Sequence, residues 1–149
     1  MSNVSADLIW EVTRLQNAYL VKRKTQGAPQ FSRDPLNLTN LHSRKHAGFV
    51  NPKAIGILPN GEKGVQVIAK KPAAANKPAS SLYKVTYTTT ARKTYKAVAR
   101  QAAKNYYRPD LRAAAVARVS AIRRAQRPVK PEPPKKLRGA AAKKAAAAQ

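Results

Sequence analysis

Residues 54–68 decide the fold, and they read AIGILPNGEKGVQVI. Before the Asn-Gly pair, Ile55 and Ile57 alternate with other residues, and after it Val65 and Val67 do the same. An Asn-Gly pair between two alternating apolar runs is the strongest short-range signal of an antiparallel hairpin, because both residues tolerate the positive φ angles of a tight turn. The segment therefore predicts two paired strands.

A third strand is expected after the hairpin. Tyr83, Val85 and Tyr87 alternate with lysine and threonine, which is the two-residue period of a strand. Between them, residues 70–79 read KKPAAANKPA and carry too little apolar surface to order themselves. We expect this stretch to be a basic loop or linker.

The residues before the hairpin predict a helix, a short strand and a long loop. Ser5 can cap a helix whose apolar stripe recurs at i, i+4, i+7 and i+11: Leu8, Val12, Leu15 and Tyr19. Residues 19–24, YLVKRK, predict a short strand that ends in a basic cluster. Residues 25–52 are rich in glycine and proline and predict mostly loop. We expect three leucines to anchor this loop to the core: Leu36, Leu38 and Leu41. Arg44, Lys45 and the flanking histidines are expected to face outward.

Two basic helices are expected after the sheet. The first covers 91–104, with Thr88–Thr90 offering an N-cap and an apolar face made by Tyr95, Val98, Ala99 and Ala102. The second runs from about Asp110 to Gln126, with Leu111, Ala115, Val119 and Ile122 on one face. Arg118 falls near that apolar face, so we expect its charged end to reach back to solvent.

The corner between these helices, residues 105–112, reads NYYRPDLR. Pro109 cannot continue the first helix, and Asp110 is a favourable N-cap for the second. Tyr106 and Tyr107 offer apolar area where two alanine-rich helices meet, so the corner is expected to fix the angle between them. Direct stacking of one tyrosine on a nucleobase is the alternative.

The charge of the chain points to an anionic partner. Thirty lysines and arginines face six acidic residues, for a net charge of +24 and a pI of about 11.1. Residues 70–149 carry 21 of these cations and only two acids. Such a charge repels itself in a compact fold unless an anion neutralises it, and nucleic acid is the first candidate, ahead of an anionic membrane surface. Trp10 then either packs on a neighbouring strand or contacts RNA or a partner protein.

The first basic helix carries a regular row of cations. Lys and Arg recur there every four residues with no acid between them: Arg92, Lys96, Arg100 and Lys104. Like charges at this spacing are mildly destabilising in a solvated helix. Such a row is favourable when phosphates separate the charges.

Enzymatic and metal sites lack support in the sequence. Cysteine is absent, which excludes disulfides and thiolate metal ligands. Asp7 and Glu11 share a helix face, but acids are common at helix starts for electrostatic reasons. His42 and His46 are spaced like metal ligands, yet no third ligand is evident, so contact with phosphate or a base is favoured. We expect no enzyme activity, no cofactor, no metal and no small-molecule substrate. No signal peptide or membrane span is expected either.

Together these elements predict an α+β fold. A small mixed domain over 1–87, with an N-terminal helix and a short antiparallel sheet with a hairpin, precedes two basic helices over 88–127. Residues 128–149 are rich in proline, lysine and alanine, and we expect an extended or disordered basic tail that can be helical near its end when bound.

Four motifs in order resemble one protein family: LIWEV with YLVKRK (8–12 and 19–24), NLTNLHSRKHAG (37–48), GVQVIAKK (64–71) and NYYRPDLRAAAVAR (105–118). The chain is similar to the ribosomal protein twenty-eight family of the eukaryotic cytosolic large ribosomal subunit. The resemblance covers about residues 5–127. It implies a non-enzymatic structural component that binds ribosomal RNA, contacts neighbouring ribosomal proteins, assembles in the nucleolus and works in the cytoplasm in translation.

Two other functions remain open at this stage. A chromatin protein similar to a linker histone would share the Lys-Ala-Pro tail, although the hairpin argues against it. A nucleolar large-subunit assembly factor with a similar amino-terminal domain is the second, although its cysteines and acidic extension are missing here.

The expected ribosomal-RNA contacts are the basic residues of the loops and helices, together with one histidine: Lys22, Arg23, Lys24, Arg44, Lys45, His46, Lys70, Lys71, Arg92, Lys93, Lys96, Arg100, Lys104, Arg108, Arg112, Arg123, Arg124 and Arg127.

Overall fold

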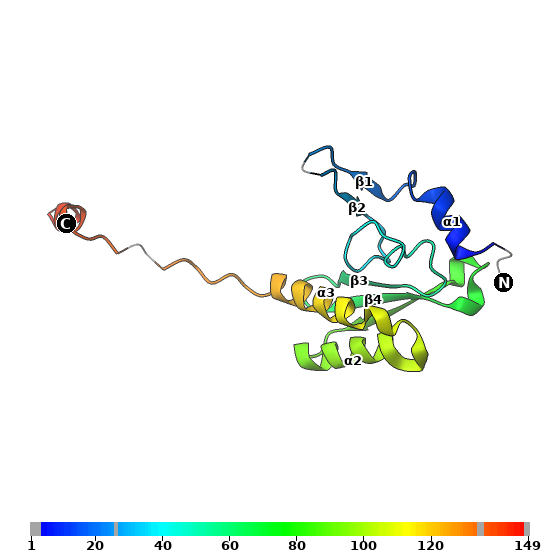
Figure 1. Ribbon diagram of the computed structural model, residues 1–149. Coiled ribbons are helices and arrows are strands. Elements are labelled where there is room, and N and C mark those ends of the chain that lie inside the picture. The colour runs from blue at the N-terminus through cyan, green and yellow to red at the C-terminus, as the bar shows by residue number, and fades with distance from the viewer. Residues whose placement is uncertain (1–3, 26, 134–135, 148–149) are drawn as a thin grey trace.

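The structure is a computed structural model that describes residues 4–25, 27–133 and 136–147. It is a mixed α/β fold with an N-terminal helix, two small antiparallel sheets and two long helices after the sheets, as the sequence predicts (Figure 1). The elements are α1 (Ala6–Thr13), β1 (Leu20–Lys22), β2 (Gln30–Ser32), β3 (Ile55–Pro59), β4 (Val65–Lys70), β5 (Leu82–Tyr87), α2 (Ala91–Ala103), α3 (Arg112–Ala125) and α4 (Ala140–Ala146).

The predicted hairpin is confirmed as β3 and β4, and the predicted third strand is β5. β4 is the central strand of this antiparallel sheet, with Ile57 opposite Val67 and Val67 opposite Val85. Gly64 ends the turn at a φ of +97°, which glycine adopts without steric cost. The sheet buries the side chains whose alternation predicted it.

Helices α2 and α3 pack against each other and cover one face of this sheet (Figure 1). Their buried residues and those of the strands form one apolar core: Ile55, Ile57, Val65, Val67, Val98, Ala102, Leu111, Ala115 and Val119. Alanine at several of the helix positions lets the two backbones approach closely. The predicted burial of Leu111, Ala115 and Val119 on one face of α3 is confirmed. On α2, Val98 and Ala102 are buried as predicted, whereas Tyr95, which packs against the core, and Ala99 are only partly buried. Thr94, which was not predicted, is fully buried, and its hydroxyl donates to the carbonyl oxygen of Thr90.

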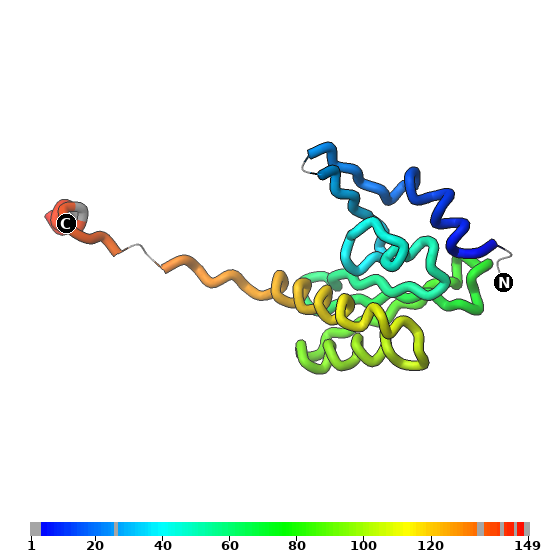
Figure 2. The backbone as a smooth tube through the Cα atoms, in the orientation of Figure 1, coloured from blue at the N-terminus to red at the C-terminus, as the bar shows by residue number. Residues whose placement is uncertain are grey.

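The loop between β2 and β3 covers the other face of the sheet (Figure 2). Leu36 packs there with Ala54 and Ile68, and Gly56 lies so close to the loop that an added Cβ would stand 2.1 Å from the carbonyl oxygen of Pro35. Leu36 and Leu38 are buried as expected. The expectation for Leu41 is wrong, since its backbone pairs with Phe31 while its side chain stays 48% exposed.

The N-terminal helix differs from its prediction. Ser5 caps α1 by accepting from the backbone N–H of Leu8, as expected, but the helix ends at Thr13 and contains no buried residue. Leu8, Val12 and Leu15 are each more than half exposed, because both faces of the large sheet are already covered by other elements. Trp10 is half-buried and packs on the ring of His42, with 4.9 Å between the ring centroids.

The C-terminal tail runs away from the sheet and helices (Figure 2). Residues 128–133 have no regular structure and are exposed, and the short helix α4 follows near the end. Residues 134–135 and 148–149 of the expected tail lie outside the described residues. The division of the chain at residues 87/88 stays a prediction, although α2 and α3 share their core with the sheet.

Candidate nucleic-acid interface

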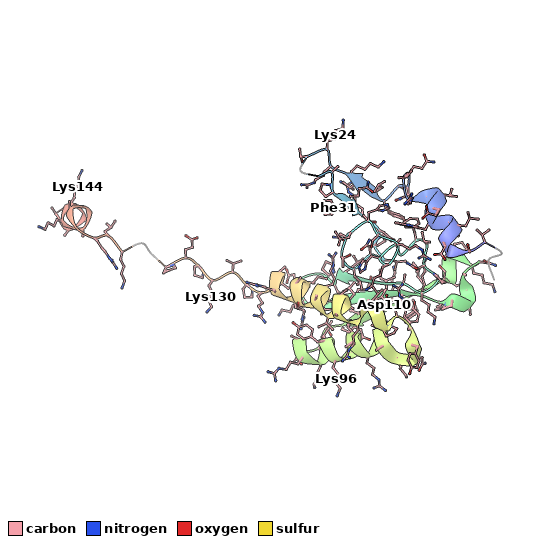
Figure 3. The ribbon with its side chains drawn as sticks, viewed as in Figure 1. Lys24, Phe31, Lys96, Asp110, Lys130 and Lys144 are labelled. Atoms are coloured by element: carbon pink, nitrogen blue, oxygen red, sulfur yellow. The ribbon has the colours of Figure 1, made fainter. Side chains whose placement is uncertain are left out.

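The outer side of α2 carries the predicted row of cations. Helix geometry places residues four apart on one side, so burying Thr94, Val98 and Ala102 against the sheet turns the row outward. All of its members are exposed: Arg92, Lys96, Arg100 and Lys104. Figure 3 shows Lys96 projecting away from the fold. The helix therefore presents a line of positive charge at intervals of about 6 Å, the rise of four residues.

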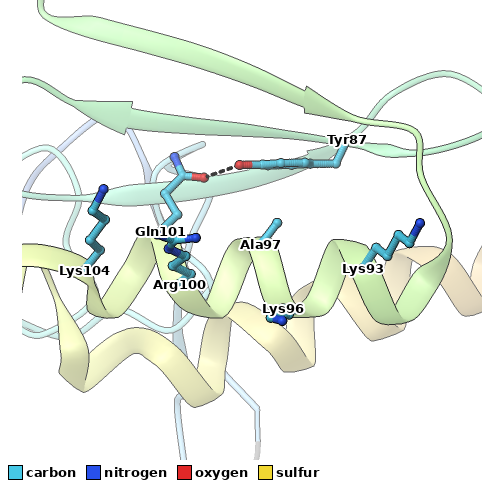
Figure 4. A pocket seen from close by; sticks show the side chains of 7 residues that line it. All are labelled: Tyr87, Lys93, Lys96, Ala97, Arg100, Gln101 and Lys104. Atoms are coloured by element: carbon cyan, nitrogen blue, oxygen red, sulfur yellow. Dashed lines mark hydrogen bonds between the residues drawn. The ribbon is translucent and has the colours of Figure 1, made fainter.

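An open groove lies between α2 and strand β5, with a volume of about 460 Å³ (Figure 4). Four cations and three uncharged residues line it: Lys93, Lys96, Arg100 and Lys104 with Tyr87, Ala97 and Gln101. The Tyr87 hydroxyl donates to Oε1 of Gln101 at 3.1 Å, and Nε2 of Gln101 donates to the Tyr83 hydroxyl at 3.4 Å. Burial raises the pKa of Tyr87, so its phenol is neutral and able to donate. Sequence reasoning missed Tyr87 and Gln101, because only the pairing of α2 with β5 brings them together.

The cations of this helix have no carboxylate partners. In the parts of the chain that the structure describes, the ion pairs are those of Arg14 with Glu11, Arg44 with Asp7 and Arg108 with Asp110. None of these involves α2. The row is thus an uncompensated positive surface in the isolated protein.

Helix α3 adds fewer free cations than the sequence predicts. Arg112, Arg124 and Arg127 are exposed, whereas Arg123 is half-buried and donates from Nη2 to the carbonyl oxygen of Thr89 at 2.6 Å. Arg118 is half-buried, and its Nε is shut off from solvent without a hydrogen-bond partner. Arg123 therefore joins α3 to the start of α2 rather than projecting freely.

The corner between the helices is braced by Arg108. Its guanidinium donates from Nη1 to the carbonyl oxygen of Lys53 and from Nη2 to that of Lys45, each at 2.9 Å. It also forms a bidentate pair with the carboxylate of Asp110, at 2.8 and 2.7 Å. This pairing lowers the pKa of Asp110, mainly through the hydrogen bond. The prediction that Asp110 caps α3 is wrong: a 3-10 turn over Pro109–Leu111 precedes the helix, so Leu111 occupies the N-cap position, and the Asp110 carboxylate pairs with Arg108 instead.

The two tyrosines of the corner have opposite environments. The Tyr107 hydroxyl lies 2.6 Å from the carbonyl oxygen of Lys70 and 3.2 Å from that of Ala54, and burial raises its pKa. Tyr107 therefore packs at the junction as expected. Tyr106 does not, since it is 87% exposed. Asn105 and Tyr106 both adopt left-handed backbone angles, with φ of 54° and 49°, which costs on the order of 1–3 kcal/mol per residue.

Lys70, another predicted contact, is turned inward. Its Nζ donates to the carbonyl oxygens of Asn51 at 3.1 Å and Phe49 at 3.3 Å, and it is half-buried. Burial lowers its pKa, an effect that the charge of Asp34 partly offsets. The neighbouring Lys71 is exposed.

Three further predicted cations lie far from α2. Lys22, Arg23 and Lys24 are exposed at the end of the β1–β2 hairpin, and Figure 3 shows Lys24 on the opposite side of the molecule from Lys96. The guanidinium group of Arg23 lies over the ring of Phe31 in a cation–π contact. Lys22, Arg23 and Lys24 therefore form a cationic region that is separate from the α2 row.

The 42–46 segment is less exposed than expected. Lys45 is exposed, but His42, Arg44 and His46 are half-buried, and Arg44 is held by Asp7 and Asn51. His46 has its Nδ1 buried without a hydrogen-bond partner, and burial lowers its pKa. Within the described residues, no group of three or more histidines and acids could hold a metal ion. In the same residues, no helix has the length and apolar character needed to cross a bilayer.

The chain matches known proteins along most of its length. Residues 8–125 match the model of the Ribosomal L28e protein family. The chain is 43% identical to Large ribosomal subunit protein eL28 of Schizosaccharomyces pombe over 130 residues, which cover 86% of this chain and 97% of the relative. It is 34% identical to Large ribosomal subunit protein eL28 of Dictyostelium discoideum over 129 residues, which cover 85% of this chain and 92% of the relative. The chain belongs to the Ribosomal L28e protein family.

Proposed function

We propose that this protein is a structural constituent of the large ribosomal subunit that binds ribosomal RNA through the cationic side of α2. Relatives that match nearly end to end are named as large-subunit proteins, which supports the ribosomal role. The observation that carries the RNA contact is the row of exposed cations on α2, which have no carboxylate partners among the described residues. Phosphates are the anions that a ribosome offers at matching density.

The protein supports translation without an active site of its own. Its partners are large-subunit ribosomal RNA and neighbouring ribosomal proteins, and it assembles in the nucleolus before working in the cytosol. The helical region 88–127 makes the main RNA contact. The hairpin end with Lys22, Arg23 and Lys24 makes a second, separate one. Arg108 and Lys70, whose charged groups are held by internal carbonyl oxygens, brace the fold and contribute little to RNA affinity.

Double-stranded RNA is a suitable ligand for the α2 row. The deep, narrow major groove of A-form RNA prevents side chains from reading base edges, so binding relies on phosphates, 2′-hydroxyls and shape. If about ten cations of this protein contact phosphates, the logarithm of the binding constant falls with the logarithm of salt concentration at a slope near −7 to −9.

Sedimentation tests the ribosomal assignment. The tagged full-length protein in a cell lysate at moderate salt is expected to migrate with large subunits, ribosomes and polysomes on a sucrose gradient and to be released only at high salt. Recovery in nucleosomes, or only in nucleolar precursor particles, would contradict the assignment.

A charge-matched pair of variants tests the surface. Replacing Arg92, Lys96, Arg100 and Lys104 with Gln should reduce the salt slope by about 3 and weaken binding to large-subunit RNA strongly. The control replaces four exposed tail cations with Gln: Lys130, Lys136, Lys143 and Lys144. Equal losses in the two variants would show that net charge, not the α2 row, determines binding.

A further inference from the structure

The exposed ring of Tyr106 is unusual for its position. Its 87% exposure contrasts with the half-buried Tyr107 next to it, in a corner where the sequence predicts that both rings pack between the helices. Of the large apolar side chains in the described residues, only Val129 in the tail is more exposed. An aromatic ring left in water at an ordered corner has apolar area to bury on a partner.

The backbone that carries this ring is held on both sides. Two consecutive left-handed residues, Asn105 and Tyr106, form the turn, and the Arg108 amide closes it by donating to the carbonyl oxygen of Ala102 at 2.9 Å. Nζ of Lys53 donates to the carbonyl oxygen of Tyr106 at 3.5 Å. Left-handed angles at a bulky residue persist only where the surroundings impose them, and such sites are frequently functional. The corner thus fixes the backbone from which the ring projects.

The surroundings of the ring are cationic. Lys104, the last member of the α2 row, precedes it by two residues, and the Lys53 ammonium contacts its backbone. Asp110 is the acid of this corner, and its carboxylate is paired with Arg108. This corner is better suited to a partner that places an aromatic plane on the Tyr106 ring and negative charge beside it than to an apolar protein surface.

We propose that Tyr106 is the platform on which an unpaired nucleobase of the bound RNA stacks, while Lys104 and Lys53 contact the flanking phosphates. This inference rests on the proposed function and adds to it a contact with single-stranded RNA at the end of α2. Unstacked bases of loops and bulges commonly stack on exposed aromatic rings, and every base has a face suited to it.

Two oligomers separate stacking from charge. The full chain is titrated with a 12-nucleotide oligoadenylate and with an abasic ribose-phosphate oligomer of the same length and charge. The unsubstituted protein should bind the oligoadenylate more tightly. Tyr106→Ala should lower affinity for the oligoadenylate about tenfold and leave affinity for the abasic oligomer unchanged. Tyr106→Phe should behave like the unsubstituted protein, because stacking requires the ring and not the hydroxyl.

A glycine variant separates stacking from folding. Tyr106→Gly relieves the left-handed strain, so it should raise the midpoint of urea unfolding while losing the same base-dependent affinity. Equal loss on both oligomers, or no loss on the oligoadenylate, would overturn the stacking role. If the unsubstituted chain binds both oligomers equally with a steep salt dependence, Tyr106 stacking fails while the proposed function stands. Failure to bind either oligomer would count against both.

Discussion

The layer of β3, β4, β5, α2 and α3 is held together differently from the N-terminal lobe of α1, β1 and β2. The first is built on a continuous apolar core in which Val65, Val67 and Val119 are fully buried. In the second, α1 buries no residue, the two strands are three residues long, and contacts such as the Arg44–Asp7 pair join α1 to the loop.

This difference determines which lysine and arginine side chains are free to bind a ligand. Arg14 of the N-terminal lobe is paired with Glu11, and the half-buried Arg44 of the adjoining loop is paired with Asp7 and joins the loop to α1. On α2 the apolar face packs the helix against the sheet, so the opposite side carries cations that the fold does not need. A regular row of cations therefore lies on the layer that is stabilised by apolar burial, whereas the lobe has a cluster of exposed cations at the end of its hairpin.

The largest expected effect tests how closely the loop between the two regions packs on the sheet. Gly56→Ala places a Cβ against the carbonyl oxygen of Pro35, so the strand or loop must move, and the free energy of unfolding should fall by about 3 kcal/mol. Urea denaturation followed by circular dichroism measures it. Gly61→Ala is the control: no atom lies within 4 Å of its added Cβ, and only its positive φ should cost about 1 kcal/mol. Equal costs would mean that the loop yields easily.

A matched pair of valines compares the two regions directly. Val119→Ala removes buried methyl groups from α3 and should cost about 2 kcal/mol of unfolding free energy. Val12→Ala in α1, where the side chain is 64% exposed, should change it by less than about 0.5 kcal/mol. A large cost at Val12 would show that α1 is covered in solution.

The tyrosine corner gives a smaller effect. Tyr107→Phe removes the hydroxyl that bonds the carbonyl oxygen of Lys70 and should lower the unfolding free energy by about 1 kcal/mol. Tyr106→Phe should leave it unchanged, because that side chain is almost fully exposed. The same denaturation experiment serves both variants, and equal effects would argue against the different roles of the two rings.

The smallest effect concerns the acid dependence of the corner. The folded state lowers the pKa of Asp110 below its usual 3.8, so the carboxylate stabilises the fold above that pH, and this contribution is lost as the pH falls through the lowered value. Asp110→Asn should cost about 0.5 kcal/mol at neutral pH, a modest figure for a 40% exposed side chain. Thermal unfolding of both proteins from neutral to strongly acidic pH should show the difference shrinking below about pH 4. A constant difference would contradict the Arg108 pairing.

The sheet and its helices could be predicted from the sequence because their patterns are local. Alternation around Asn60-Gly61 identifies the hairpin, and the spacing of Leu111, Ala115 and Val119 identifies the buried face of α3. The same logic was wrong for α1. Periodicity shows which residues share a face, but not whether another element covers that face, and here α2, α3 and the loop already occupy the sheet.

The candidate site could be predicted only in part. The row on α2 follows from four-residue spacing, whereas the inward orientation of Lys70 and Arg108 depends on carbonyl oxygens brought near by the tertiary fold. Asp110 was expected to cap α3, but its carboxylate pairs with Arg108. The sequence alone does not show this competing contact. The groove beside Tyr87 likewise requires the packing of β5 on α2.

The hydroxyl of Tyr107 reaches the carbonyl oxygens of Ala54 and Lys70, at adjoining ends of two neighbouring strands. The corner between α2 and α3 is thereby tied to the sheet before any partner arrives. Under the proposed function, the two helices would meet RNA at this preset angle and would fit only polynucleotide surfaces of matching shape. Because the angle between the helices is already set, ordering them on binding would cost less conformational entropy, and more of the interaction free energy would remain as affinity.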